Sequence, residues 1–407
     1  MNIAIVAGKR TPFGKFQGVL KRRSAVELGG LSLQAVLRQA APEEDQASAL
    51  KEAIDHVILG TVITAGLGQV PARQAARSAG LPWHTSAETI NKVCASGMRA
   101  ITLGETMIRA GDAELILAGG MENMSRAPHA LLDVRDGWRM GDRRAVDLML
   151  NDGLMCPFYD VHMAVHGSRV AKEYGVDRAA QDAFALESHR RAIRAIDAGY
   201  FDEEIVPVED PAGQKGGGPG LVKYDESPRR DTSLKKLAQL PPVFEPDGTI
   251  TAGNAPGVND GAAAVLLASE EARERFSLPK LATILGHAMI AEEAPYIATA
   301  PARAIQKLLQ KTGYTLEDID LLEINEAFAA VPLVSAKLLG LSSHDIETRL
   351  NINGGAVALG HPIGASGARL VLTLAYALIR RGGGLGIAAI CSGTGQGDAV
   401  LIRVDDR

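Results

Sequence analysis

The sequence predicts an α/β fold in which sheets are buried between helices. Three observations support this prediction: short apolar runs alternate with stretches of helical periodicity, glycine is abundant, and several segments recur at a nearly constant spacing. Of 407 residues, 44 are glycine, about 11% against an average near 7%. Such an excess is typical of tight strand–helix turns or of backbone packed against a ligand.

Six short apolar runs, each bounded by glycine or polar residues, are typical of buried strands. They comprise residues 3–7, 57–59, 115–118, 262–268, 321–324 and 385–390. Four stretches between these runs have helical spacing, namely residues 24–39, 97–109, 301–311 and 365–381. Residues 24–27 and 315–318 both match the capping-box pattern that begins helices. This alternation of strands and helices favours sheets covered on both faces.

The first part of the sequence is echoed near its end. Residues 54–55, 94–99 and 115–120 recur in the same order as residues 319–320, 364–369 and 386–391, about 265 to 271 positions later. We therefore expect two similar halves, each of βαβ type. The first would comprise residues 1–121 and 251–275, and the second residues 276–407.

Between the two halves the apolar periodicity weakens. Residues 122–250 include helical stretches at 163–174 and 179–198 and a glycine-rich tract at 211–220 that is typical of a flexible turn or linker. We interpret this interval as an inserted loop domain for substrate recognition and subunit contacts.

Composition excludes several classes of protein. The net charge of −5 and the aromatic content of 4% argue against nucleic-acid binding. Three cysteines do not form a disulfide framework and suit a reducing compartment. The longest apolar run, residues 370–379, is too short to span a bilayer. We therefore expect a cytoplasmic protein without a membrane span.

Two cysteines and a histidine are candidates for catalysis. Cys94 precedes small residues that open a helix, where the helix dipole would lower the thiol pKa and make a nucleophile; the alternative is a small buried hydrophobe. His361 follows one of five glycines in fifteen residues before a helix and is a candidate general base. Cys391 precedes the turn 392–397, whose backbone N–H groups, including that of Gly393, can bind an oxyanion.

Other polar positions are less specific. Asn325 follows the strand at 321–324 and can orient a water or hold an oxyanion, although asparagine is also common in turns. His162 and His166 have the spacing of a metal-binding pair, but no third ligand accompanies them, so we expect no metal. The glycines after Cys391 lack the following βαβ unit of a dinucleotide fingerprint, so we expect no NAD site.

Seven segments, in order along nearly the whole chain, resemble the thiolase family of acetyl-CoA acetyltransferases and 3-ketoacyl-CoA thiolases. They are residues 9–14 (KRTPFG), 91–97 (NKVCASG), 119–125 (GGMENMS), 251–254 (TAGN), 325–328 (NEAF), 360–367 (GHPIGASG) and 391–395 (CSGTG). The resemblance implies an α/β fold of two similar halves in αβαβα layers, with a loop domain inserted in the first. It also implies a homodimer or homotetramer, and it leaves open a β-oxidation partner subunit.

The resemblance further implies a transferase of fatty acid metabolism that condenses acyl-CoA thioesters or cleaves 3-ketoacyl-CoA, most simply an acetyl-CoA C-acetyltransferase. Cys94 would carry the acyl group, His361 would take its proton, and Cys391 would exchange a proton with the α-carbon. Asn325 would hold a water near the enolate, and Gly393 would donate its N–H to the acyl oxygen. Coenzyme A thioesters would be substrates, and no cofactor would be needed.

For coenzyme A, the resemblance places His162 and Met163 along the pantetheine arm and Arg230 near the nucleotide. Pro256 stands where many family members have serine, and it offers neither a hydroxyl nor an N–H. Two alternatives remain: a ketoacyl synthase, which pairs its cysteine with two histidines, and a non-catalytic acyl-CoA-binding module. Asn325 and Cys391 favour a thiolase over the first, and the complete set of four reactive residues argues against the second.

Overall fold

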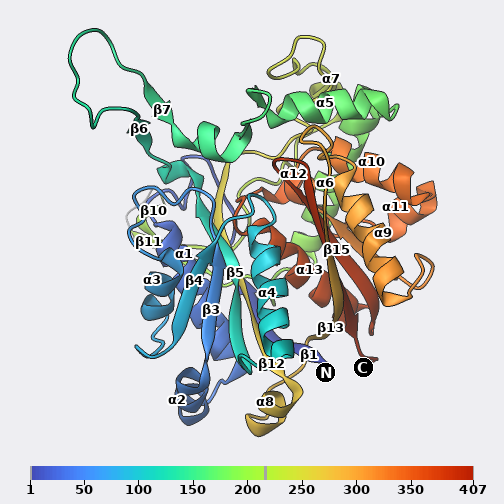
Figure 1. The fold of residues 1–407 in the computed structure, drawn as a ribbon. Helices are drawn as coiled ribbons and strands as arrows, with labels where there is room; N and C mark the ends of the chain where they lie inside the picture. The colour runs from blue at the N-terminus through green and yellow to red at the C-terminus, as the bar shows by residue number, and fades with distance from the viewer. Residues whose placement is uncertain (1, 215–217, 407) are drawn as a thin grey trace.

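The computed structural model describes residues 2–214 and 218–406. Its main sheet has the strand order β14-β15-β16-β13-β1-β12-β5-β3-β4 (Figure 1). The first half contains β1 (Ile3–Arg10), β3 (His56–Gly60), β4 (Ser86–Ile90), β5 (Leu115–Asn123) and β12 (Asn259–Ser269). The second half contains β13 (Ala282–Ala291), β14 (Leu321–Ile324), β15 (Gly384–Ser392) and β16 (Gln396–Val404).

The two halves repeat the same strand arrangement, as the internal echo of the sequence predicts. In the first half β3 and β5 are parallel, whereas β5, β12 and β1 are successively antiparallel. In the second half β14 and β15 are parallel, whereas β15, β16 and β13 are successively antiparallel. The halves meet where β1 pairs antiparallel with β13, from Ile3 opposite Ile284 to Ile5 opposite Ala282.

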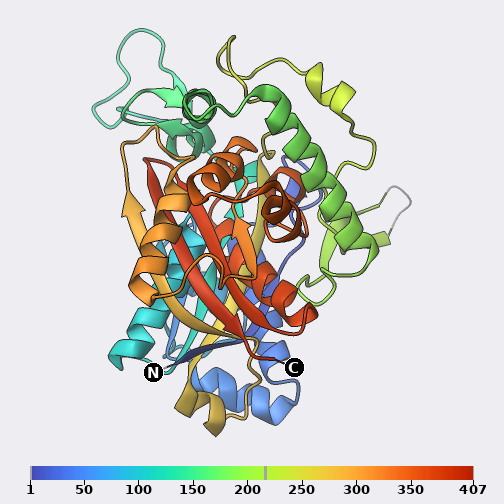
Figure 2. The ribbon, with the colours of Figure 1, turned by 90° about the vertical axis from the view of Figure 1, so that its right-hand side faces the viewer.

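Helices separate and cover the two halves, as Figure 2 shows from the side. Helices α1 (Ala25–Ala40) and α3 (Pro71–Ser78) pack on the outer face of the first half, and α9 (Ala300–Thr312) contacts the outer face of the second. Helices α4 (Ser96–Ala110) and α13 (Ser366–Arg380) lie between the halves and contact strands of both. The result is the αβαβα layering that the resemblance implies.

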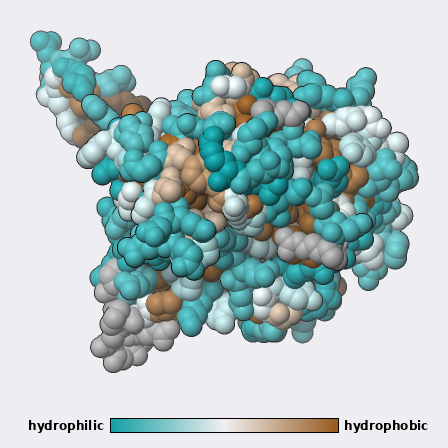
Figure 3. All heavy atoms as spheres, turned by 90° about the horizontal axis from the view of Figure 1, so that it is seen from below, coloured by the Kyte–Doolittle hydropathy of each residue, from teal (hydrophilic) through white to brown (hydrophobic). Residues whose placement is uncertain are grey.

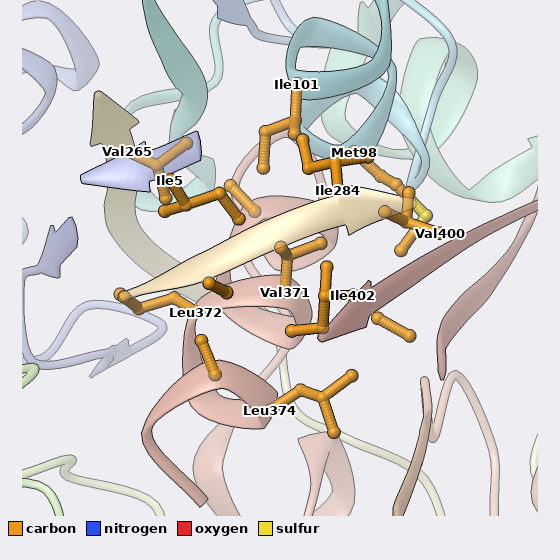
Figure 4. Packing of buried hydrophobic residues seen from close by; sticks show 14 of the residues in the cluster. Ile5, Met98, Ile101, Val265, Ile284, Val371, Leu372, Leu374, Val400 and Ile402 are labelled. Atoms are coloured by element: carbon orange, nitrogen blue, oxygen red, sulfur yellow. The ribbon is translucent and has the colours of Figure 1, made fainter. Parts of the chain in front are cut away.

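The central layer explains the most apolar part of the sequence. Helix α13 is buried at every position from Ser366 to Leu378, because a helix covered on all sides has no solvent-facing stripe. Its side chains form a core with α4 and with strands of both halves (Figure 4). Separate cores lie beneath α1 and α3 and beneath α9, so each sheet face is buried, which accounts for the continuous apolar runs of the strands.

All six predicted strands and all six predicted helices are present, and most of the strands extend further than the sequence patterns. The sequence did not reveal β4, β13 or β16. The capping box at Ser24 begins α1 as expected. The one at Thr315 was wrong as a helix signal: its N–H and hydroxyl bond the Asp318 carboxylate, but the chain turns there and enters β14 within three residues.

The interval between the halves contains helices and small hairpins. Its elements are η1 (Met124–Arg126), β6 (His129–Leu131), β7 (Ala145–Asp147), the π-helix η2 (Met149–Leu154), β8 (Met155–Cys156), β9 (Val161–His162), α5 (Met163–Glu173), α6 (Arg178–Asp197), β10 (Val208–Gln214), β11 (Gly218–Val222) and α7 (Leu234–Ala238). Part of the predicted linker at 211–220 lies outside the described residues. The assignment of 122–250 as a separate loop domain stays a prediction.

Short elements complete the fold: β2 (Gly14–Lys15), α2 (Glu44–Ala53), α8 (Glu270–Arg275), α10 (Ala330–Leu339), α11 (Ser343–Thr348) and α12 (Ala356–Leu359). The hairpin of β6 and β7 extends away from the body of the molecule (Figure 1). From below, the surface is mainly hydrophilic with small hydrophobic areas (Figure 3). Within the described ranges, no helix combines the length and apolarity needed to cross a membrane.

Candidate active site

The first turns of helices α4 and α13 cross at the centre of the molecule. A Cβ atom added to Gly97 would lie 2.9 Å from the backbone N of Ala368 and from the carbonyl oxygen of Gly364. One added to Gly367 would lie 2.5 Å from the backbone N of Met98. These glycines therefore allow backbone to approach backbone, and they bring the segments that precede both helices together.

A cavity of about 340 Å³ opens at this crossing and is lined mostly by apolar side chains. Three candidate residues from distant parts of the sequence, Cys94, His361 and Cys391, line it together with Gly393. The predicted coenzyme A contacts His162, Met163 and Pro256 line the same cavity. Seven of the nine candidate residues thus line the same cavity.

Cys94 sits in a strained turn just before α4. The preceding Val93 has φ of 47°, in the left-handed region that a β-branched residue rarely adopts, at a cost of about 1–3 kcal/mol. The Asn91 Oδ1 accepts a hydrogen bond from the Val93 N–H, and the Ser96 hydroxyl donates to the Val93 carbonyl. Local hydrogen bonds therefore support this conformation and fix where the sulfur lies.

The expectation that the helix dipole would lower the Cys94 pKa was wrong. Burial raises the pKa of this thiol to about 12, although hydrogen bonding from the Gly393 N–H opposes the shift. Burial also raises the pKa of Cys391, and the neighbouring Cys94 adds to that shift. Desolvation outweighs the dipole because it acts on the whole thiolate charge, so both thiols are neutral without substrate.

His361 is held as a neutral imidazole with a defined tautomer. Burial, with a smaller contribution from Arg369, lowers its pKa to about 3. Its Nδ1 lies 2.6 Å from the Ser366 hydroxyl, which itself donates to the carbonyl of Pro362 at 2.9 Å. Because the Ser366 hydroxyl already donates its proton to the Pro362 carbonyl, Nδ1 of His361 must carry a hydrogen and donate it to the hydroxyl oxygen. The lone pair is then on Nε2, as a general base requires.

Asn325 lies behind His361 and is completely buried directly after β14. Its Nδ2 is 3.5 Å from His361 Nε2. Its Oδ1 is buried and has no hydrogen-bond partner within the described part of the chain. A buried amide oxygen of this kind is a ready acceptor for a water molecule.

Two buried carboxylates that sequence analysis missed hold these segments in place. Both oxygens of Glu122 accept hydrogen bonds, from the backbone N–H groups of Val62, Ile63 and Gly364 and from the Thr61 hydroxyl. It thereby joins a loop of the first half to the turn between His361 and α13. Burial raises its pKa to about 7, against the effect of these bonds.

Glu326, next to Asn325, does the same within the second half. Its carboxylate accepts hydrogen bonds from the Ser188 hydroxyl, the Asn351 amide and the Val357 N–H. Both carboxylates occur in segments that carry the family resemblance. The signal that could have found them is an acidic residue directly after, or at the end of, a buried strand.

The coenzyme A candidates divide into two groups. His162 stacks on Phe244 with ring centroids 3.7 Å apart, and burial lowers its pKa to about 4, so it offers a neutral surface beside Met163. Arg230 does not line the cavity: it forms an exposed ion pair with Asp197, beside a separate hollow. In the described part of the chain, no three acidic, histidine or cysteine side chains gather as metal ligands.

Comparisons with known proteins agree with this geometry. Residues 3–271 match the model of the thiolase N-terminal domain, and residues 278–404 match that of the thiolase C-terminal domain. An acetyl-CoA acetyltransferase of Chromobacterium violaceum is 47% identical over 99% of this chain and 100% of its own length. An acetyl-CoA acetyltransferase of Pseudomonas aeruginosa is 46% identical over 99% and 100%. A probable acetyl-CoA acetyltransferase of Escherichia coli is 45% identical over both full lengths.

Proposed function

The chain belongs to the thiolase family of acyltransferases, and we propose that it is an acetyl-CoA C-acetyltransferase that works through an acyl-Cys94 intermediate. The observation that carries this proposal is the convergence of Cys94, His361 and Cys391 at one apolar cavity. Two thiols and a neutral imidazole in one cavity provide a nucleophile and the means to move its proton.

In the first half-reaction, Cys94 attacks the carbonyl carbon of acetyl-CoA while His361 Nε2 takes the thiol proton. Because the thiol pKa is near 12 and the imidazole pKa near 3, this transfer must accompany attack instead of preceding it. The Gly393 N–H stabilises the oxyanion. The coenzyme A thiolate leaves with the proton of Cys391, which leaves a Cys391 thiolate and a protonated His361.

In the second half-reaction, the Cys391 thiolate removes a proton from the methyl group of a second acetyl-CoA. Protonated His361 and a water held by the free Oδ1 of Asn325 stabilise the enolate oxygen. The enolate carbon attacks the acyl carbonyl and releases the Cys94 thiolate, which His361 reprotonates. Every proton is returned, and the same path run backwards is thiolysis of a 3-ketoacyl-CoA.

Coenzyme A enters along the apolar part of the cavity. His162, Met163 and Phe244 come from the interval 122–250 and line this part together with Pro256, which supports a role for that interval in substrate recognition. Proline supplies shape and a carbonyl but no N–H, so pantetheine must be held there mainly by packing. Arg230 is assigned to the nucleotide end, outside the cavity.

A homodimer or homotetramer is part of the proposal, as are a cytoplasmic location and a role in fatty acid metabolism. The loop of the β6–β7 hairpin exposes Leu132, Trp138 and Met140, and the exposed fraction of Met140 is 91%. Large apolar side chains at that exposure are typical of a surface that contacts another subunit.

Mixing the protein with acetoacetyl-CoA and coenzyme A tests the proposal. The absorbance of the ketoacyl thioester should fall, and a quenched sample should show acetyl on Cys94 by mass spectrometry. Cys94→Ala should abolish the acyl-enzyme. Cys391→Ala should still be acylated by acetyl-CoA, because the leaving coenzyme A thiolate can take its proton from His361 instead, but it should not form or cleave the carbon–carbon bond. A folded wild-type protein without turnover would favour an acyl-CoA-binding module, and equal loss of both half-reactions in Cys391→Ala would contradict the assigned roles.

A further inference from the structure

The two sulfur-bearing segments are joined by a buried ion pair that lies outside the catalytic set. Lys92, two residues before Cys94, places its Nζ 2.7 Å from the Asp398 Oδ2. The Asp398 side chain is 1% exposed and that of Lys92 is 15% exposed. Asp398 lies on β16 directly opposite Ile390 of β15, so it is one residue pair away from Cys391.

Each of the two segments contains a strained residue. Val93 precedes Cys94 with φ of 47°, and Thr394 follows Gly393 with φ of 70°. A Cβ atom added to Gly393 would lie 3.4 Å from the Val93 side chain, so the two strained turns are in contact. Strained backbone of this kind persists only where its surroundings fix it.

Lys92 is the ion-pair partner of Asp398. Burial raises the pKa of Asp398, and the charges of Lys92, Arg99 and His287 oppose that shift; the ion pair that the structure gives His287 is with Glu105. One buried carboxylate thus holds the Cys94 turn against the Cys391 hairpin. Burial of a charge is tolerated when it is paired in this way.

We propose that the Lys92–Asp398 ion pair is a positioning element of the active site, which sets the separation between the Cys94 turn and the Cys391–Gly393 hairpin. The inference rests on the proposed function. Transfer of the acyl group needs the Gly393 N–H at the oxyanion and the Cys391 sulfur at the α-carbon, and both belong to the hairpin that Asp398 anchors. The pantetheine contacts lie elsewhere in the cavity and do not depend on the pair.

Steady-state thiolysis of acetoacetyl-CoA by Lys92→Met, Asp398→Asn and the double variant tests this proposal. We expect kcat per active site, counted by acylation of Cys94, to fall at least about tenfold in Asp398→Asn, since small misplacements of reacting groups are costly. KM should stay within about twofold, because substrate binding is unchanged. Lys92→Met should lose at least as much as Asp398→Asn, because it leaves the buried carboxylate without its ion-pair partner.

The double variant should be no slower than the slower of the two single variants, because the second change removes nothing further from a broken pair. Lys92→Arg, which keeps the charge, should retain at least about half of the wild-type kcat. As a control for lost stability, Arg349→Met breaks an ion pair with Asp345 at the end of α11 and should leave kcat unchanged.

Losses that multiply in the double variant, a raised KM with unchanged kcat, or a kcat within about twofold of wild type in Asp398→Asn would each overturn the proposal. A wild-type protein without thiolysis would instead overturn the proposed function. The two failures are therefore distinguishable in one experiment.

Discussion

Replacing Ser366 by alanine should impair catalysis through the tautomer of His361. The hydroxyl accepts the Nδ1 hydrogen at 2.6 Å and donates to the Pro362 carbonyl at 2.9 Å. In the variant a buried N–H loses its acceptor, which costs about 1–3 kcal/mol. The ring can avoid that cost by moving its hydrogen to Nε2, where the lone pair is needed. The active tautomer is then disfavoured about 5- to 100-fold.

Single-turnover acylation of Cys94 by acetyl-CoA measures this effect directly, because it isolates the step in which His361 takes a proton. Ser335→Ala is the matched control: Ser335 lies on α10, its buried hydroxyl donates to the Ala298 carbonyl, and neither residue lines the cavity. Both variants should lose similar stability in thermal unfolding, but only Ser366→Ala should be acylated slowly. Acylation within about twofold of wild type would refute the assigned tautomer.

Three further predictions concern packing, pH and coenzyme A. Gly97→Ala should destabilise the fold by about 1–3 kcal/mol in denaturant unfolding, because the backbone of α13 would lie 2.9 Å from the new Cβ. The control Gly111→Asn should leave the free energy of unfolding nearly unchanged, because Gly111 has open space around it and a φ of 85° that asparagine tolerates. His189→Gln should make the free energy of unfolding fall less, or rise more, than in the wild type when the pH is lowered from 6.5 to 4.5. Burial lowers the pKa of His189 to about 4, so this imidazole binds a proton in that range only when the chain unfolds. An unchanged slope would contradict this linkage. Arg230→Ala should raise KM for coenzyme A but not for a pantetheine thioester that lacks the nucleotide, and equal effects on both would remove Arg230 from the nucleotide end.

The sequence pointed to the proposed reactive residues because their surroundings carry local signals. A glycine-rich junction before a helix marks His361, and a turn between strands marks Cys391; both signals are short-range. The chemistry of Cys94 was predicted less well. Its position before α4 was correct, but the expected fall in pKa was wrong because burial depends on α13 and the Cys391 hairpin, which are far away in the sequence.

The supporting residues could not be recognised from local patterns, because their partners are distant. Glu122 accepts hydrogen bonds from residues 59–61 positions before it and from the Gly364 N–H 242 positions after it. The partner of Lys92, Asp398, stands in β16, a strand that sequence periodicity did not reveal. The arrangement of strands was predictable from internal repetition, whereas the contacts between the halves required coordinates.

The internal repeat explains why one site combines a nucleophile with a base. Equivalent units of the two halves, each a turn followed by a central helix and a strand (α4 and β5, α13 and β15), point the first turns of α4 and α13 at the same place. The first unit supplies Cys94 and the second supplies His361 before its helix. Neither half contains both groups, so the cavity exists only where the halves pack. Glycines at 97, 120, 364 and 367 allow that packing, because a Cβ added at each would lie within 3.0 Å of atoms of another segment, so a side chain there would push apart the segments that carry the sulfur and the imidazole.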